Sequence, residues 1–189
     1  SPPRRSSDLT DIGNVVNGGN TLGFTNFGTL NGGAGNDTFK VFTGGSLTGA
    51  VNGGGGSNTL DYSNDSGVLS VSVAAGAGSS LGGGFSNIQV LVGDDGLAGT
   101  SFTLIGDNTN DAFSITGSNS GSLTYNASAN LLTFSGVGNL KGGTGNDSFT
   151  FGATGALAGS LDGVSGADSL DLSALGVGTV NLTADGANG

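Results

Sequence analysis

The chain has 189 residues, of which 41 are glycine and 34% are hydrophobic, so it holds too little apolar material for a conventional globular core. All 14 acidic residues are aspartate and only four residues are basic; the net charge of −10 argues against nucleic acid as a partner and suits divalent cations. The absence of cysteine excludes a disulfide framework, and no stretch approaches the roughly 18 apolar residues of a membrane span.

The first ten residues are predicted to form a flexible arm or a processed end. They begin with SPPRRSS, which lacks the apolar centre of a signal peptide. From residue 11 onward, apolar residues alternate with polar ones in short runs such as residues 70–73 (SVSV) and 112–115 (AFSI), the period of a strand with one buried face. Collagen is excluded because there are only two prolines and glycine does not recur at every third position.

A long repeat becomes visible when the chain is compared with itself at an offset of 110. Residues 30–63 align with residues 140–173, and the equivalence extends to about residues 20–73 and 130–182. Repeats of this kind build proteins in which each unit stacks on its neighbour. We therefore predict that residues 11–189 form a single all-β domain, a parallel β-helix or β-solenoid.

A second, shorter spacing lies inside each copy of the long repeat. The glycine-rich turn at Gly32 is followed by another at Gly53, and the turn at Gly142 by another at Gly163. Two strands and two turns would thus make one coil of about 21 residues, with glycine at the corners where a Cβ atom does not fit. Residues 74–84 (AAGAGSSLGGG) are predicted to be a loop between coils.

Two turns carry the motif that points to chemistry. Residues 32–40 (GGAGNDTFK) and 142–150 (GGTGNDSFT) both fit the nonapeptide Gly-Gly-x-Gly-x-Asp-x-apolar-x. A third, weaker match at residues 106–115 keeps Asp111 but has only one of the expected glycines, so a metal-free relic of the motif is the alternative there. Ca²⁺ requires six to eight oxygen ligands, and a glycine turn presents its carbonyl groups without steric obstruction.

These turns resemble the calcium-binding repeats of RTX (hemolysin-type) exoproteins and, in their longer context, the giant repetitive surface adhesins of bacteria. The resemblance implies Ca²⁺ held between successive turns by backbone carbonyls and Asp carboxylates. Carried over to this chain, with the stacked neighbour of each turn included, it gives the candidate metal-binding residues Gly33, Gly35, Asp37, Asn58, Gly143, Gly145, Asp147, Asp168 and Asp111.

The chain also departs from the family, whose nonapeptides run in immediate tandem, whereas here a whole coil separates one turn from the next. The pair Asp147 and Asp168 supplies two carboxylates and Asp37 with Asn58 only one, so we expect the former pair to bind more tightly. The alternative is that Asn and Asp bond to the turn backbone and form stacked ladders without any ion.

The function that follows is a non-enzymatic structural repeat of a secreted bacterial surface protein, an adhesin stalk or spacer on the cell surface. Its expected partners are other repeats of the same or identical chains, and surface glycans or a neighbouring cell. An extracellular filament or surface-layer subunit is the alternative. A polysaccharide-active β-helix enzyme is a third reading, opposed by the absence of His, Cys, Glu and Trp. Asp61 and Asp171 are predicted to face outward as solvated edge charges.

Overall fold

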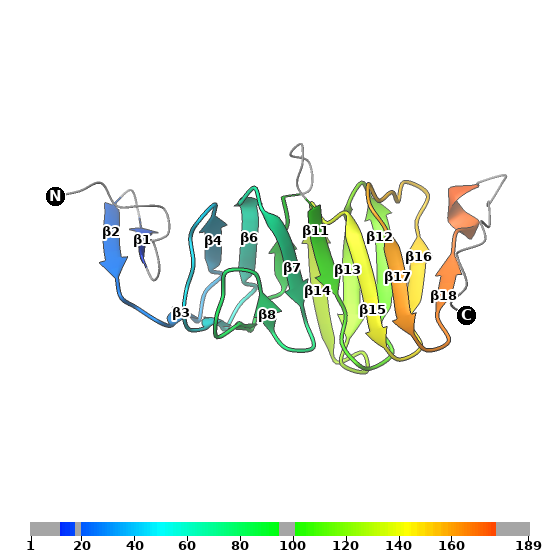
Figure 1. Cartoon of the computed structure of the whole chain (residues 1–189), viewed down its shortest axis with the longest axis horizontal. Helices are drawn as coiled ribbons and strands as arrows, with labels where there is room; N and C mark the ends of the chain where they lie inside the picture. Colours follow the sequence, from blue (N-terminus) through cyan, green and yellow to red (C-terminus); the bar gives the residue numbers. More distant parts are fainter. Residues whose placement is uncertain (1–11, 18–19, 95–100, 177–189) are drawn as a thin grey trace.

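The computed structural model describes residues 12–17, 20–94 and 101–176, which form an elongated all-β protein (Figure 1). The predicted arm at residues 1–10 and residues 177–182 of the second repeat lie outside the described ranges. Within those ranges the one helical segment is the 3-10 turn η2 (Ser173–Leu175), and no helix is long and apolar enough to cross a membrane.

The strands are short and follow one another closely along the chain. The first nine are β1 (Ile12–Asn17), β2 (Asn20–Thr25), β3 (Leu30–Gly33), β4 (Thr38–Phe42), β5 (Val51–Gly54), β6 (Thr59–Asn64), β7 (Val68–Ser72), β8 (Ala77–Gly78) and β9 (Phe85–Ser86). The next nine are β10 (Val90–Val92), β11 (Ser101–Ile105), β12 (Ala112–Gly117), β13 (Ser120–Tyr125), β14 (Asn130–Ser135), β15 (Asn139–Thr144), β16 (Ser148–Phe151), β17 (Leu161–Ser165) and β18 (Ser169–Asp171).

Apart from the β1–β2 hairpin, these strands form three sheets. The largest has eight strands in the order β18-β16-β12-β13-β14-β10-β6-β4 and runs along the molecule. A five-stranded sheet, β17-β15-β11-β7-β8, and a three-stranded sheet, β3-β5-β9, contain the strands that lead into the glycine-rich turns. Because each turn carries the chain from one sheet into the eight-stranded sheet, turns of neighbouring units lie over one another.

The spacing between the glycine-rich turns appears directly in the strand register. Leu30 pairs with Val51 and Thr38 with Thr59, both in parallel, and the second repeat shows the same pairing between β15 and β17 and between β16 and β18. The all-β class and the parallel stacking of segments at this spacing are therefore confirmed.

One antiparallel insertion interrupts this parallel arrangement. Strands β12, β13 and β14 form a meander inside the eight-stranded sheet, so that β14 pairs in parallel with β10 on one side and β12 pairs in parallel with β16 on the other. The predicted loop at residues 74–84 contains the two-residue strand β8, which pairs antiparallel with β7.

The core lies between the sheets and is continuous along the molecule. Among the described residues, aromatic side chains meet at two points: the Tyr62 and Phe102 ring centroids are 5.5 Å apart, and Phe113 stacks on Phe149 at 4.8 Å. The largest fully buried side chains are Tyr62, Phe102, Phe113, Leu60, Leu91, Leu104, Ile115, Leu123, Leu132, Leu140, Val51 and Val71.

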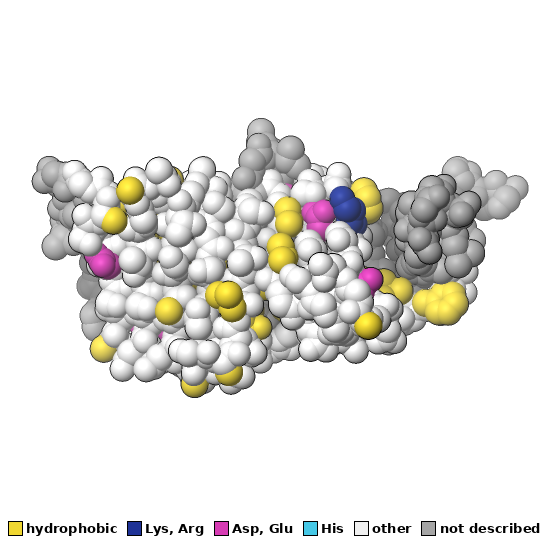
Figure 2. All heavy atoms as spheres, turned by 180° about the vertical axis from the view of Figure 1, so that it is seen from behind, with side chains coloured by type: hydrophobic (Ala, Val, Ile, Leu, Met, Phe, Trp, Pro, Cys, Tyr) yellow, Lys and Arg dark blue, Asp and Glu magenta, His cyan; other side chains and the backbone are white. Residues whose placement is uncertain are grey.

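The face seen in Figure 2 is built mainly from backbone and uncharged polar side chains. Figure 2 shows one broad face on which hydrophobic side chains occur in small separate groups and charged side chains are few. Isolated apolar residues of this kind are normal for a protein surface. On that face, then, nothing gathers into a large apolar patch.

Candidate functional site

The glycine-rich turns, together with the glycine-free connection at residues 87–89, form two stacks, one in each half of the molecule. The N-terminal turn stack consists of residues 32–37, 53–58 and 87–89, which connect β3 to β4, β5 to β6 and β9 to β10. The C-terminal turn stack consists of residues 106–111, 142–147 and 163–168, which connect β11 to β12, β15 to β16 and β17 to β18.

A ladder of side-chain hydrogen bonds runs through the N-terminal turn stack. The Asp37 N–H donates to Oδ1 of Asn58 at 2.9 Å, and the Asn58 N–H donates to Oε1 of Gln89 at 2.9 Å. Asn58 is fully buried, and its Nδ2 donates to the carbonyl oxygens of Gly55 and Asn87. Two neutral amides therefore follow Asp37 in this stack, and Asn58 is well supplied with hydrogen-bond partners.

The same ladder in the C-terminal turn stack is made of carboxylates. The Asp111 N–H donates to Oδ1 of Asp147 at 2.8 Å, and the Asp147 N–H donates to Oδ1 of Asp168 at 2.9 Å. The predicted neighbours Asp147 and Asp168 thus meet, and Asp111 adjoins Asp147 on its other side. Three acidic side chains in consecutive turns distinguish this stack from the N-terminal one.

A second ladder runs in the opposite direction through the residue that precedes each aspartate. Oδ1 of Asn36 accepts the Ser57 N–H, that of Asn110 accepts the Asn146 N–H, and that of Asn146 accepts the Ala167 N–H, each at 2.8 Å. The Asn side chains therefore accept from the following turn, whereas the Asp147 side chain accepts from the preceding one. The ion-free hydrogen bonding considered from the sequence is present in both stacks.

The first glycine of the motif leaves room for the carboxylate that lies across its turn. A Cβ atom at Gly142 would collide with Oδ2 of Asp147 and come within 2.8 Å of the Gly163 carbonyl oxygen. Gly32 with Asp37 repeats this arrangement. Glycine is therefore required here by the close approach of a side chain and of the next turn.

The glycines predicted to face the metal are Gly33, Gly35, Gly143 and Gly145. Their carbonyl groups stack closely on the following turn, as the carbonyl of Gly33 shows by accepting the Gly55 N–H at 2.6 Å. A Cβ atom at Gly166 would collide with the Gly145 carbonyl oxygen. Backbone oxygens of one turn therefore contact the next turn, and the Gly33 oxygen already accepts a hydrogen bond.

Several carboxylate oxygens in the stacks are buried and lack a hydrogen-bond partner, namely Oδ2 of Asp37, Oδ1 of Asp111 and Oδ2 of Asp147. Asp111 and Asp147 are only 2% and 1% exposed. Burial raises the pKa of Asp111 to about 7, and the charges of Asp107 and Asp147 act in the same direction. Burial also raises the pKa of Asp147, assisted by Asp168 and Asp107. The two adjacent carboxyls therefore need either a proton or a cation.

Asp107 belongs to this cluster and is a residue that sequence reasoning missed. It occupies the place that Gly143 holds in the complete motif, and it is 8% exposed. Its Oδ1 accepts the N–H and hydroxyl of Thr109, both at 2.6 Å, and its Oδ2 accepts the Asn126 N–H at 2.7 Å. Burial pushes the Asp107 pKa upward, but these hydrogen bonds outweigh it, so the pKa is lowered. Asp107 stays ionised beside Asp111.

No three acidic side chains converge on one point as a preformed metal site anywhere in residues 12–17, 20–94 and 101–176. A cation in the C-terminal turn stack would therefore take carboxylate oxygens from adjacent turns and complete its ligand set with backbone oxygens. That composition suits Ca²⁺, which accepts irregular oxygen ligands.

Asp61 and Asp171, both predicted to face outward, differ from each other. Asp171 is exposed, whereas Asp61 is 7% exposed and its Oδ2 lies 3.1 Å from Nζ of Lys40. The prediction of a solvated edge charge was wrong for Asp61, because β10 continues the sheet beyond β6 and a lysine of β4 contacts the carboxylate.

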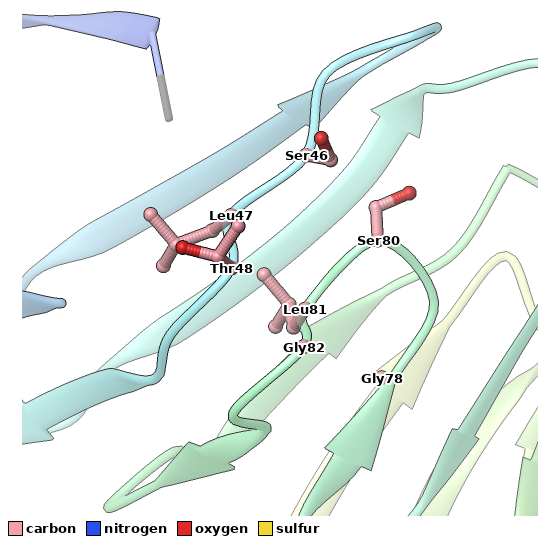
Figure 3. A pocket seen from close by; sticks show the side chains of 7 residues that line it. All are labelled: Ser46, Leu47, Thr48, Gly78, Ser80, Leu81 and Gly82. Atoms are coloured by element: carbon pink, nitrogen blue, oxygen red, sulfur yellow. The ribbon is translucent and has the colours of Figure 1, made fainter. Parts of the chain in front are cut away.

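The described residues also line two shallow hollows, the second of which borders the C-terminal turn stack. Figure 3 shows one of about 360 Å³ between residues 46–48 and 78–82, where Leu47 and Leu81 lie on facing segments. Its lining has no ionisable side chain, and the Leu47 N–H donates to the Ser80 carbonyl at 2.8 Å. This hollow lies where two stacked units contact each other. The other, about 370 Å³, is lined by Val73, Ala74, Asp107, Asn108, Thr109, Tyr125, Asn126 and Asn130.

Comparisons of the chain with models of protein families, with curated proteins and with solved structures found no match. The resemblance to RTX repeats therefore stays a prediction that rests on the turn motif.

Proposed function

We propose that this chain is a non-enzymatic structural segment of a secreted bacterial surface protein, a β-solenoid rod that serves as an adhesin stalk or spacer and is stabilised by Ca²⁺. The observation that carries the calcium part is the adjacent pair Asp111 and Asp147, whose buried carboxylates each have an oxygen without a hydrogen-bond partner.

Support for a solenoid comes from the register of the parallel strands. Successive units stack with turn over turn, and leucine, valine and phenylalanine from these units share one core. Such a molecule gains length by adding units, because each unit contacts mainly its neighbours. A long, acidic rod with a polar surface is suited to holding a binding domain away from a cell.

Calcium is favoured by a comparison of the two stacks. Asn58 accepts the N–H of the preceding turn with a neutral amide oxygen, as Asp147 does with a carboxylate oxygen. The ladder therefore does not need a carboxylate. Three carboxylates in consecutive turns, two of them buried, raise one another's free energy unless a cation neutralises them. We therefore place the ion in the C-terminal turn stack between Asp111 and Asp147, with Asp168 beside them at the outer turn.

The test uses Asp147→Asn, which keeps the ladder oxygen and removes the charge. We expect millimolar Ca²⁺ to raise the melting temperature followed by circular dichroism, and Asp147→Asn to weaken Ca²⁺ binding measured by titration calorimetry about tenfold or more. Asp37→Asn in the N-terminal turn stack is the matched control and should leave most of the binding intact. Mg²⁺ controls for ionic strength.

Identical melts in Ca²⁺ and in chelator would remove calcium from the proposal. An Asp147→Asn protein that is stabilised without Ca²⁺ and responds to Ca²⁺ as the parent does would favour the ion-free ladder instead.

A further inference from the structure

The second of the two hollows, of about 370 Å³, lies beside turn 106–111, and we call it the hairpin hollow. Turn 142–147 covers one face of turn 106–111, and a Cβ atom at Gly143 would collide there with the Asp107 carbonyl oxygen. The other face adjoins the end of β7, because β11 lies between β15 and β7 in its sheet (Figure 1). After β7 the chain reverses into β8 instead of adding a turn to the stack, which leaves the hollow.

The tip of the β13–β14 hairpin borders the hairpin hollow on another side. The Asn126 N–H donates to Oδ2 of Asp107 at 2.7 Å, and Tyr125 pairs with Asn130 at the base of the tip. These four residues all line the hollow. Hydrogen bonds between the tip and turn 106–111 therefore fix the two walls relative to each other, so the hollow belongs to the folded structure before any ligand binds.

The lining of the hairpin hollow combines apolar groups with a carboxylate. Val73 and Ala74 at the end of β7 and the half-buried ring of Tyr125 provide the apolar part. Asp107 supplies the one carboxylate of the lining, and asparagine and threonine side chains provide the remaining polar groups. A hollow of this size and composition suits a small ligand group that has both an apolar and a polar part.

The charge of Asp107 is not balanced by a basic side chain of the described residues. The ion pairs in that part of the chain join Lys40 to Asp61 and Lys141 to Asp162. Both oxygens of Asp107 accept hydrogen bonds, but the donors are backbone N–H groups and a hydroxyl, which are neutral. Because neutral donors leave the negative charge in place, and because the whole chain has a net charge of −10, the hollow attracts cationic groups.

We propose that the hairpin hollow binds a primary ammonium group on a hydrocarbon stem, in the form of a lysine side chain of a partner protein. The carboxylate of Asp107 attracts the ammonium, while Val73 and the Tyr125 ring contact the stem and the ring adds cation–π attraction. A metal ion would gain nothing from these apolar groups, and a neutral sugar would gain nothing from the charge.

The hydrogen bonds of Asp107 also favour lysine over arginine. A guanidinium binds a carboxylate best through two parallel hydrogen bonds, one to each oxygen. Oδ1 of Asp107 already accepts the N–H and the hydroxyl of Thr109, and Oδ2 accepts the Asn126 N–H. A compact ammonium needs only one remaining acceptor position, so it suits this carboxylate better.

The binding test uses Nα-acetyl-lysine amide as the probe and the whole chain as the protein, in Ca²⁺ and in chelator. The chain has no tryptophan and two tyrosines, of which Tyr62 is completely buried, so tyrosine fluorescence reports on a ligand that contacts Tyr125. We expect a saturable fluorescence change in both buffers. Nα,Nε-diacetyl-lysine amide, which lacks the charge, should bind at least about tenfold more weakly.

Asp107→Asn tests the carboxylate directly. It keeps a side-chain oxygen and removes the charge, and it should weaken binding of the probe at least about tenfold. Asp171→Asn is the matched control, because Asp171 is exposed and outside the hollow, and the net charge changes by the same amount. Equal weakening by the two substitutions would show attraction by overall charge alone and would overturn the proposal.

Asn130→Lys tests the hollow without removing the Asp107 anchor of the hairpin. Asn130 is exposed, and a lysine there places the chain's own ammonium at the hollow, so probe binding should again fall at least about tenfold. Leu131→Lys adds the same charge at the next residue of β14, which points to the opposite face of the strand, and should leave binding unchanged.

Three results with the parent protein contradict the proposal. The first is a probe that binds no better than its diacetylated form. The second is binding in chelator that Ca²⁺ abolishes, which would assign the hollow to metal ions. The third is glucosamine that binds as tightly as the lysine probe, because the hydrocarbon stem would then contribute nothing. The proposal is independent of the calcium site, since probe binding is expected in both buffers.

Discussion

At Asp111 and Asp147, the carboxylate oxygens have two different environments. One oxygen of Asp147 accepts the Asp111 N–H, while the other is buried without a hydrogen-bond partner. Asp107 approaches from the same turn as Asp111, and its N–H donates to Oδ2 of Asp111 at 2.6 Å. Because Asp107 has its own donors and keeps a lowered pKa, the proton that such a cluster requires without metal falls on Asp111.

This cluster predicts the pH dependence of the metal-free protein. The pKa of Asp111 is raised from 3.8 to about 7 on folding, so its protonation stabilises the folded state fully below about pH 4. That stabilisation is lost as the pH rises through 7. We therefore expect the melting temperature in chelator to fall between about pH 4 and pH 7.

Two variants of the same experiment separate Asp111 from the other carboxyls. Asp111→Asn should make the profile in chelator shallower, with a residual slope from Asp147, whose pKa is also raised. Ca²⁺ should flatten the profile in the parent protein because the ion replaces the proton. The aspartates with lowered pKa values, Asp61, Asp107 and Asp171, lose their contribution only as the pH falls toward and below 3.8, outside this window. A melting temperature in chelator that rises from pH 4 to pH 7 would contradict the assignment.

The β13–β14 hairpin is the element that joins the two parallel halves of the eight-stranded sheet. At its tip, Asn126, Ala127 and Ser128 all have positive φ, at 54°, 52° and 70°. The Asn126 N–H is held by Asp107, and the Ala127 N–H donates to Oγ1 of Thr109 at 3.1 Å. A left-handed backbone costs non-glycine residues roughly 1 kcal/mol or more each, so these anchors hold a strained turn.

Replacing Ala127 by glycine should relieve this strain. We expect Ala127→Gly to raise the free energy of unfolding by up to about 1 kcal/mol, because glycine adopts positive φ without steric cost. Ala129→Gly is the control: Ala129 does not have positive φ, so glycine there should lower stability by about 0.5–1 kcal/mol. Urea unfolding measures both, and equal effects of the two substitutions would show that the left-handed turn is not strained.

The hairpin also explains why the coil spacing can be predicted from the sequence and the contact between Asp111 and Asp147 cannot. The spacing of the coils is readable because glycine turns mark both ends of each unit. Asp111 and Asp147 are 36 residues apart, since the hairpin is inserted between their turns, and a fixed spacing therefore fails to pair them. The tip has the sequence Asn-Ala-Ser-Ala, without the Gly or Pro that usually marks a hairpin, and its strands alternate like all the others.

The role of Asp107 is not predicted from the sequence, for a related reason. Asp107 occupies a position where the motif requires glycine, so the sequence alone indicates only an incomplete motif. In the structure, Asp107 anchors the hairpin and adds a charge to the stack. The carboxylates named from the sequence are those of the complete motif and of the neighbours one coil further on, together with Asp111 as a weaker match. The contacts that depend on the insertion emerge only when the chain is folded.

Across the whole molecule, two copies of one sequence pattern occupy different positions in a stack. Leu60 and Leu170 follow the same kind of turn, enter the same sheet and precede an aspartate, yet one is covered by β10 and the other lies on the outermost described strand of its sheet. Because the local sequences are alike, the two leucines differ in exposure through the number of neighbouring strands that cover them.

This position dependence predicts unequal costs for the same substitution. Leu60→Ala should lower the free energy of unfolding by about 2–5 kcal/mol, because it opens a cavity among fully buried side chains. Leu170→Ala should cost less than about 1 kcal/mol in the monomer, where the side chain is 54% exposed. Urea unfolding at concentrations below any association compares the two directly. If Leu170→Ala proves as costly as Leu60→Ala, the exposure of the side chain does not decide the cost of the substitution, and the position dependence is contradicted.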